Sequence, residues 1–122
     1  MRILIVDDSS VMRKIVTRGL RQAGFDMDEV LEAGNGQEGL DALINANDDV
    51  QLILSDWNMP VMDGLTFVKG VRAKGNQTPI IMVTTEGGDS KLTAAMNAGA
   101  NGSIKKPFTP DVLRETLGKY FD

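Results

Sequence analysis

The chain has 122 residues, of which 42% are hydrophobic and 25% charged, values that predict a single globular domain over residues 1–122. The absence of cysteine and histidine excludes disulfide scaffolds, zinc sites built from those residues, and catalytic triads that use imidazole as the base. Thirteen basic and seventeen acidic residues give a net charge of −4, which argues against nucleic acid or an anionic membrane as a partner. Because no apolar stretch is long enough for a signal peptide or a membrane span, we expect a soluble cytoplasmic protein.

Short apolar runs bounded by polar or turn residues recur along the chain, a pattern typical of strands buried on both faces of a parallel sheet. The strong candidates are residues 3–6, 52–54 and 80–83, and the weaker ones are residues 27–32 and 102–105. Between them, apolar residues recur at helical spacing in four segments. These residues are Met12, Ile15, Val16 and Leu20; Leu40, Leu43 and Ile44; Leu65, Val68 and Val71; and Leu92, Ala95 and Met96.

Capping residues mark the first and last of the predicted helices. Ser9 or Ser10 is a candidate cap for the first helix. The last helix is expected to begin at Thr109, with Pro110 at its first helical position and Asp111 in its first turn. Its apolar residues are Val112, Leu113, Leu117 and Phe121. Strand and helix thus alternate five times, which predicts an α/β, flavodoxin-like, doubly wound (βα)5 fold with a five-stranded parallel sheet in the order 2-1-3-4-5.

Side chains capable of chemistry follow four of the five predicted strands. Asp7 and Asp8 end the first strand, Asp56 the third, Thr84 the fourth and Lys106 the fifth. In an open α/β sheet, ligands bind beyond the carboxyl ends of the strands, and the order 2-1-3-4-5 makes the first and third strands neighbours. We therefore expect three carboxylates to lie close together. A hard divalent cation that prefers oxygen ligands, usually Mg²⁺ inside cells, would relieve their repulsion.

Such a site suits phosphoryl transfer. Mg²⁺ keeps coordination positions for phosphate oxygens, and a carboxylate such as Asp56 can act as a nucleophile and form an acyl phosphate. Thr84 would offer a hydroxyl donor, and Lys106 a positive charge, to the oxygens of the incoming group. Each residue alone has a plain structural explanation, as a helix cap, a turn residue, a satisfied hydroxyl or a solvated charge. Only their combination favours a phosphoryl site.

A second pattern competes with this interpretation. Gly34, Gly36 and Gly39 form G-x-G-x-x-G between a predicted strand and a predicted helix, with Asp56 about 20 residues further on, as in a dinucleotide-binding turn. However, the pattern follows the second strand, whereas this fingerprint normally follows the first, and Asp56 already belongs to the predicted carboxylate cluster. The alternative is that these glycines permit a tight loop and close helix packing.

Four segments together resemble the receiver domain of bacterial two-component response regulators, and most closely its single-domain chemotaxis members. They are residues 6–9 (VDDS), 55–64 (SDWNMPVMDG), 82–84 (MVT) and 106–108 (KPF). The resemblance covers essentially the whole chain, and the combination is specific although each segment alone is not. It implies a signalling domain and not an enzyme, with self-phosphorylation from a donor and self-dephosphorylation as its only catalysis.

The resemblance implies a role for each carboxylate. Asp56 would be the phosphoacceptor, and Asp7, Asp8 and Asp56 would bind Mg²⁺ together with the backbone carbonyl of Asn58. The donor would be a phosphohistidine on a separate sensor histidine kinase, which agrees with a chain that has no histidine of its own.

The resemblance also assigns the residues around the acceptor. Thr84 would move toward the phosphoryl group. Lys106, and not Lys105, would take the family's lysine role because it directly precedes Pro107, and the bond between them is typically cis. The loop after the acceptor would be shaped by Pro60, Asp63 and Gly64.

Two positions depart from the family pattern. The family usually has an aromatic residue three positions before the lysine, which swings inward behind the threonine, whereas this chain has Ser103 there. Thr85 replaces the small residue that is common beside the threonine, which would narrow access to the phosphate. Thr84 and Ser103 are thus the expected switch positions, and the missing ring weakens the expected coupling to the surface of the fourth helix, fifth strand and fifth helix.

We expect phosphorylation of Asp56 to switch binding to an effector protein, such as a flagellar motor switch component in chemotaxis. The alternative, favoured by Ser103, is a phosphate sink or a relay intermediate that exchanges phosphate with a phosphotransfer protein. An aspartyl-phosphate phosphohydrolase has less support, because it needs a second acid two residues after the nucleophile, where this chain has Asn58.

Overall fold

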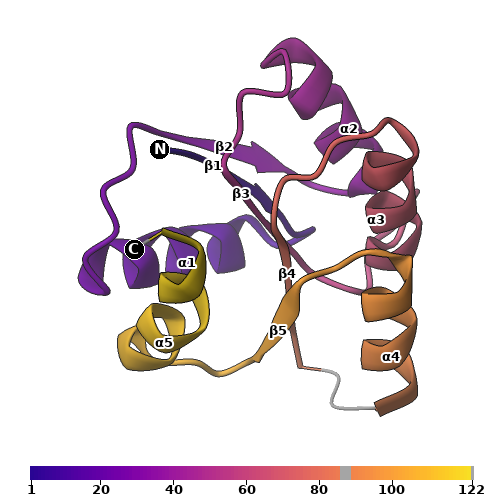
Figure 1. Cartoon of the computed structure of the whole chain (residues 1–122). Coiled ribbons are helices and arrows are strands. Elements are labelled where there is room, and N and C mark those ends of the chain that lie inside the picture. The colour runs from indigo at the N-terminus through magenta and orange to yellow at the C-terminus, as the bar shows by residue number, and fades with distance from the viewer. Residues whose placement is uncertain (86–88, 122) are drawn as a thin grey trace.

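Strands and helices alternate along residues 1–85 and 89–121, the part of the chain that the computed structural model describes (Figure 1). In chain order they are β1 (Arg2–Val6), α1 (Ser10–Gln22), β2 (Glu29–Ala33), α2 (Gly36–Asn45), β3 (Leu52–Ser55), α3 (Gly64–Ala73), β4 (Ile80–Thr84), α4 (Asp89–Ala98), β5 (Gly102–Lys105) and α5 (Pro110–Phe121). None of these helices is long and apolar enough to span a membrane.

All five strands pair in parallel, in the order β2-β1-β3-β4-β5. Helices α1 and α5 cover one face of the sheet, and α2, α3 and α4 cover the other (Figure 1). The predicted flavodoxin-like, doubly wound fold and its strand order are therefore confirmed. The order reverses at β1, so the carboxyl ends of β1 and β3 are adjacent, which is where such sheets bind ligands.

The continuous apolar runs reflect burial on both faces of the sheet. In β1, Ile3 and Ile5 belong to the core under α1 and α5, whereas Leu4 and Val6 belong to the core under α2, α3 and α4. None of the four side chains is more than 2% exposed. Each position of such a strand faces a helix layer, so the sequence shows no alternation of apolar and polar residues.

The weaker strand predictions differ in accuracy. Strand β5 has the predicted bounds, while β2 begins at Glu29, two residues later than predicted, and continues to Ala33. The predicted run began at Met27, which packs against the α1 and α5 core from the loop before the strand. Hydrophobicity alone therefore placed a loop residue in the strand.

The predicted caps are found at both helices. Ser9, and not Ser10, caps α1, and its hydroxyl accepts a hydrogen bond from the Met12 amide at 3.1 Å. The Thr109 hydroxyl likewise accepts from the Val112 amide at 3.2 Å, at the start of α5. These bonds satisfy amides that have no partner within the helix.

Five residues of the predicted apolar helix faces are exposed. They are Ile15, Ile44, Leu92, Met96 and Val112, with exposed fractions between 39% and 55%. Helical spacing gives the side of a helix on which a residue lies, but not how far the sheet extends beneath that side. The side chain of Phe121 lies outside the described part of the chain.

Candidate functional site

The backbone fixes two aspartates side by side at the carboxyl edge of the sheet. Val6 of β1 and Ser55 of β3 are paired in register, and the Asp56 amide, one residue further, donates to the Val6 carbonyl at 2.9 Å. The Asp7 amide donates to the Ala33 carbonyl of β2 at 3.0 Å. The sheet hydrogen bonding thus extends into the site and holds its acidic residues in place.

Asp7, Asp8 and Asp56 form an acidic cluster in which one carboxylate oxygen from each lies within 4.8 Å of the others. Asp7 is buried, Asp56 is partly buried and Asp8 is exposed. The Ser9 amide donates to Asp7 Oδ1 at 2.9 Å. Like charges at this separation repel one another, so the predicted gathering of carboxylates creates a strong demand for positive charge.

Lys106, the residue after β5, places a cation against this cluster from the far side of β4. Its Nζ lies 3.0 Å from Asp7 Oδ2 and 3.5 Å from Asp56 Oδ2, and only 9% of its side chain is exposed. The Lys106–Pro107 peptide bond is cis. Neighbouring Lys105 is exposed and makes no ion pair within the described residues. Of the two adjacent lysines, Lys106 therefore reaches the site.

Burial raises the pKa of the Asp56 carboxyl above its ordinary value of 3.8, because desolvation disfavours the charged form. Two donors oppose this effect: the Trp57 amide, which is 2.7 Å from Asp56 Oδ1, and the Lys106 ammonium. Asp7 adds a smaller repulsion that raises the Asp56 pKa further. A divalent cation would act in the same direction as Lys106 and favour the ionised carboxylate.

The donor set fits a hard cation such as Mg²⁺. Three carboxylate oxygens converge, one of them from the exposed Asp8, so the cluster opens toward solvent. Asp8 and Asn58 also line a shallow depression of about 430 Å³ together with Met59, Pro60 and Asp63. Asn58, the fourth predicted ligand, is therefore beside the cluster and on its open side.

The two predicted switch positions lie on β4 and β5. Thr84 is the last residue of β4, is partly buried, and is the register partner of Lys105. Ser103 lies on β5 opposite Met82 and is exposed. Thr85, the other departure, is also exposed. The position where the resemblance leads one to expect an aromatic ring is thus a small surface side chain.

Two of the residues predicted to shape the loop after Asp56, Asp63 and Gly64, make structural contacts there. The Asp63 side chain caps α3 by accepting from the Thr66 amide at 2.9 Å. The Gly64 amide donates to the Trp57 carbonyl at 2.8 Å, and a Cβ at this position would overlap the Asp56 carbonyl oxygen. Val61, also in this loop, is 84% exposed and has a φ of 67°, a left-handed conformation that is strained for a β-branched residue.

Two neighbours of the site were not predicted from the sequence. Arg13 of α1 donates from Nη1 to the Asp7 carbonyl at 2.6 Å and pairs through Nε with Glu32 at 2.9 Å. Lys91 of α4 lies with its Nζ 5.8 Å from the centroid of the Trp57 ring, a cation–π arrangement. The sequence offers one indication of the position of Arg13, which lies one helical turn after the Ser9 cap and therefore on the same side of α1 as the site.

The glycine pattern of the competing hypothesis serves local packing. The amide of Gly34 donates to Glu38, and the amide of Gly36 donates to the Met62 carbonyl. A Cβ at Gly36 would lie 2.7 Å from Met62, and one at Gly39 would lie 2.7 Å from Phe67. These amides are already paired and the glycines allow close contact, so the loop is not arranged to bind a pyrophosphate.

Residues 3–118 match the family model described as the response regulator receiver domain. The chain is 52% identical over 119 residues to a chemotaxis protein CheY homolog of Campylobacter jejuni, a match that covers 96% of this chain and 89% of that protein. The family match thus runs from within β1 to within α5.

Solved structures show the same fold. The structure of chemotaxis protein CheY4 of Vibrio cholerae has a TM-score of 0.85 and 40% identity, with 98% of each chain covered. A chain from the CheX–CheY–BeF3–Mg²⁺ complex of Borrelia burgdorferi has a TM-score of 0.86 and 25% identity, covering all of this chain and 90% of that one.

Proposed function

This chain belongs to the response regulator receiver domain family as a CheY-like chemotaxis response regulator, and we propose that it accepts a phosphoryl group on Asp56. The main support for this proposal is the geometry around Asp56. Lys106 Nζ lies 3.5 Å from Asp56 Oδ2 and 3.0 Å from Asp7 Oδ2. Asp56 is the partly buried member of the acidic cluster, whereas Asp7 is buried and Asp8 exposed. It is thus both accessible and held in place, as a nucleophile must be.

We propose that Asp7, Asp8 and Asp56 hold Mg²⁺, with the backbone carbonyl of Asn58. The support is the convergence of three carboxylate oxygens within 4.8 Å and the position of Asn58 in the depression beside Asp8. When bound, the ion supplies positive charge for the oxygens of a transferring phosphoryl group. Residues of the chain then complete the site.

The proposed transfer begins at an ionised Asp56 carboxylate. One of its oxygens attacks the phosphorus of a phosphohistidine, the P–N bond breaks, and the imidazole nitrogen leaves with the bonding electrons. The Lys106 ammonium and the Thr84 hydroxyl would donate to the phosphoryl oxygens as charge moves onto them. A partner must supply the phosphohistidine because the chain has no histidine, and we propose a sensor histidine kinase in the cytoplasm. We also propose that the chain autophosphorylates from small donors and dephosphorylates itself.

We infer that the phosphorylated chain changes its affinity for an effector such as a flagellar motor switch component. A phosphoryl group can shift a conformational equilibrium only as far as it binds one state better. Thr84 is the one hydroxyl-bearing residue of β4, the strand that precedes α4. Ser103 favours a second candidate, a phosphate sink or relay, because a small exposed side chain cannot move inward behind Thr84 as a ring can.

The phosphoacceptor proposal is tested with the fluorescence of Trp57, the only tryptophan of the chain. Mg²⁺ is titrated first, then beryllofluoride or a small acyl phosphate, with wild type and Asp56→Asn compared. We expect emission to respond to metal and then to donor, and one added phosphoryl group by mass on the wild type alone. A wild type without metal response or mass change would refute the proposal.

A separate experiment distinguishes the output regulator from the sink. Purified motor switch protein and a histidine phosphotransfer domain are each offered to the chain with and without beryllofluoride. Tighter binding to the switch protein with beryllofluoride supports output. Phosphate return from phosphorylated Asp56 to the phosphotransfer domain, without any gain in binding to the switch protein, supports the sink.

A further inference from the structure

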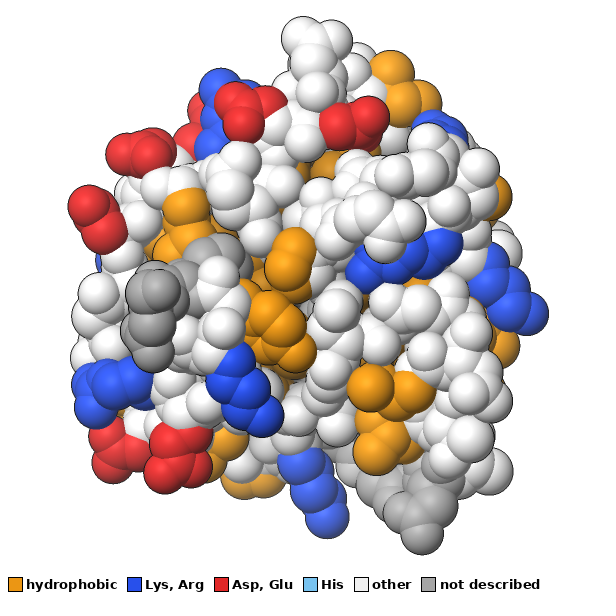
Figure 2. Space-filling model, viewed as in Figure 1, with side chains coloured by type: hydrophobic (Ala, Val, Ile, Leu, Met, Phe, Trp, Pro, Cys, Tyr) orange, Lys and Arg blue, Asp and Glu red, His pale blue; other side chains and the backbone are white. Residues whose placement is uncertain are grey.

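Helix α1 is strongly basic in an acidic protein. Four of the thirteen basic residues lie on it, Arg13, Lys14, Arg18 and Arg21, and it contains no acidic residue. The rest of the chain therefore contains nine basic residues and all seventeen acidic ones. Figure 2 shows a different pattern on the face viewed there, where Lys and Arg side chains are scattered singly over the surface.

Three of these cations have no acidic partner among the described residues. Arg13 pairs with Glu32, but Lys14, Arg18 and Arg21 are exposed and form no ion pair within residues 1–85 and 89–121. Lys14 and Arg18 are spaced i, i+4, and Arg18 and Arg21 are spaced i, i+3, so they lie on one face and repel one another. A helix that served only to cover the sheet would be more stable with acids at some of these positions.

The same three cations line a groove. The α1–β2 groove is bounded by Lys14, Thr17, Arg18, Arg21, Val30 and Glu32 and has a volume of about 470 Å³. It lies between α1 and the edge strand β2, and the partly buried Val30 and Thr17 supply uncharged surface between the cations. It offers both positive charge and a place for a small apolar side chain.

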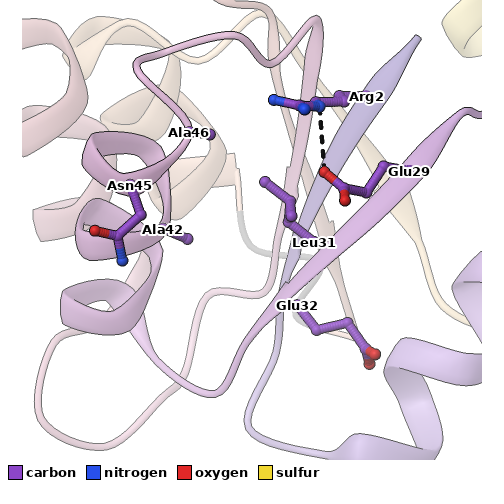
Figure 3. Close-up of a pocket in the computed structure, with 7 residues that line it drawn as sticks. All are labelled: Arg2, Glu29, Leu31, Glu32, Ala42, Asn45 and Ala46. Atoms are coloured by element: carbon purple, nitrogen blue, oxygen red, sulfur yellow. Dashed lines mark ion pairs between the residues drawn. The ribbon is translucent and has the colours of Figure 1, made fainter.

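A groove on the opposite face of β2 differs in its charge balance. Figure 3 shows Arg2, Glu29, Leu31 and Glu32 on its strand side and Ala42, Asn45 and Ala46 on its helix side. Arg2 is the one cation there, and it pairs with Glu29 at 3.2 Å and with Asp49 at 3.5 Å. The cation of this groove is thus paired, whereas the α1–β2 groove has three cations without an ion pair in the described part of the chain, and its one acid, Glu32, pairs with Arg13.

We propose that the α1–β2 groove docks an acidic segment of a partner protein, in which carboxylates alternate with small apolar residues. The carboxylates of the segment would pair with the cations of α1 that line the groove. Its small apolar side chains would contact Val30 and Thr17, which lie between those cations. A flat anionic membrane or a nucleic acid duplex fits less well, because the groove is lined by an exposed acid, Glu32, and the chain as a whole carries a net charge of −4, both of which oppose an extended polyanion. The acidic cluster contributes no residue to the groove, so this binding is a property beyond the phosphoacceptor function and does not depend on Asp56.

The test uses a fluorescein-labelled synthetic peptide of alternating glutamate and valine, with binding followed by fluorescence anisotropy. The triple variant Lys14→Gln, Arg18→Gln, Arg21→Gln is compared with a matched control, Lys69→Gln, Lys74→Gln, Lys119→Gln, which removes three exposed lysines elsewhere. We expect the α1 variant to weaken binding on the order of tenfold and the control less than about twofold. Equal losses would show attraction to net charge alone and overturn the proposal, as would equal wild-type affinity for a glutamine and valine peptide.

Nuclear magnetic resonance of the intact wild type gives a second measurement that does not depend on the folding of variants. Peptide should shift the amide signals of Lys14, Thr17, Arg18, Arg21 and Val30, in wild type and Asp56→Asn alike. Shifts centred elsewhere would overturn the assignment. Tighter binding to phosphatidylglycerol vesicles or to duplex DNA than to the peptide would also overturn it, in favour of that class of ligand.

Discussion

At the amino edge of the sheet, one guanidinium is surrounded by neutral acceptors, whereas at the carboxyl edge three carboxylates surround one ammonium group. Arg72, near the end of α3, donates through Nε and Nη2 to the Gly99 carbonyl at 3.1 and 2.9 Å. It also reaches the Asn76 carbonyl at 2.8 Å and Asn101 Oδ1 at 3.0 Å. Burial lowers the pKa of Arg72, but these four hydrogen bonds compensate for lost water.

The amino-edge network extends to two other elements. Asn101 Oδ1 also accepts from the Ile80 amide at 2.9 Å, at the start of β4, and the Tyr120 hydroxyl of α5 donates to the Asn101 carbonyl at 3.2 Å. The acidic cluster is not balanced in this way, because the single positive charge of Lys106 only partly offsets its three like charges. The comparison teaches that one edge provides stability while the other retains unbalanced charge that a ligand can relieve.

Replacing Arg72 should have the largest effect on stability. Arg72→Met leaves the Gly99 and Asn76 carbonyls and the Asn101 amide oxygen without this donor, and we expect a loss of about 3 kcal/mol in the free energy of unfolding. Urea unfolding measures it, with the exposed Lys74→Met as the control. A loss below about 1 kcal/mol would show that water replaces the guanidinium easily and that the amino edge is not the stabilising one.

Replacing Lys106 should have a smaller effect that depends on pH. Lys106→Met removes the cation 3.0 Å from Asp7 and 3.5 Å from Asp56, and we expect a loss of about 2 kcal/mol at neutral pH. The loss should shrink in acid, where protonated carboxyls no longer repel. Denaturant unfolding at several pH values measures it, and exposed Lys105→Met should show neither the loss nor its pH dependence. A loss that stays constant with pH would indicate a packing effect.

Removing the charge of Asp56 should instead stabilise the fold. Because desolvation raises the pKa of folded Asp56, the folded state binds this proton more tightly than the unfolded state does. Wild type therefore loses stability as the pH rises from the ordinary value of 3.8 through the folded pKa, and the loss persists at neutral pH. Asp56→Asn should gain about 1 kcal/mol at neutral pH and nothing in strong acid.

Thermal unfolding across pH, without divalent metal, measures this gain. Exposed Asp26→Asn provides the matched control and should change little at any pH. A gain for Asp56→Asn that remains in strong acid would mean that the amide improves packing and that charge is not the cause. Destabilisation at neutral pH would contradict the assigned electrostatic imbalance of the carboxyl edge.

The carboxyl edge was predictable from sequence and the amino edge was not. Strand ends are visible as apolar runs followed by Asp7, Asp56 and Lys106, and the strand order alone brings those ends together. Arg72 and Gly99 are 27 residues apart, and the helical spacing in their two segments does not pair them, because their contact depends on how α3 and α4 pack. Local patterns carry no information about that packing.

The same reason explains the misplaced apolar faces. Ile15 and Val112 have the helical spacing of buried residues, yet both are exposed, because spacing gives the direction of a side chain and not the extent of the sheet beneath it. The position of Arg13 against the Asp7 carbonyl likewise depends on the angle between α1 and β1. Chemistry at strand ends was thus predictable, and the contacts between helices and the site were not.

The smallest expected effect concerns the contact between α4 and the acceptor loop. Lys91 Nζ is 5.8 Å from the centroid of the Trp57 ring, and the Trp57 amide donates to Asp56 at 2.7 Å. We expect Lys91→Met to cost about 0.5 kcal/mol and to change the emission of Trp57, whereas Lys91→Arg should preserve both. Urea unfolding followed by that emission measures the two quantities together.

This contact matters because Ser103 leaves no ring on β5 to connect the acceptor with α4. If Lys91→Met also reduces the response of Trp57 to beryllofluoride, the contact links the charged edge to α4 and takes over part of the coupling that a ring at position 103 would provide. An unchanged response, with stability lowered alone, would confine Lys91 to a structural role. In that case the acceptor loop would respond to its ligand without engaging α4, and the phosphate-sink candidate would gain support over the output regulator.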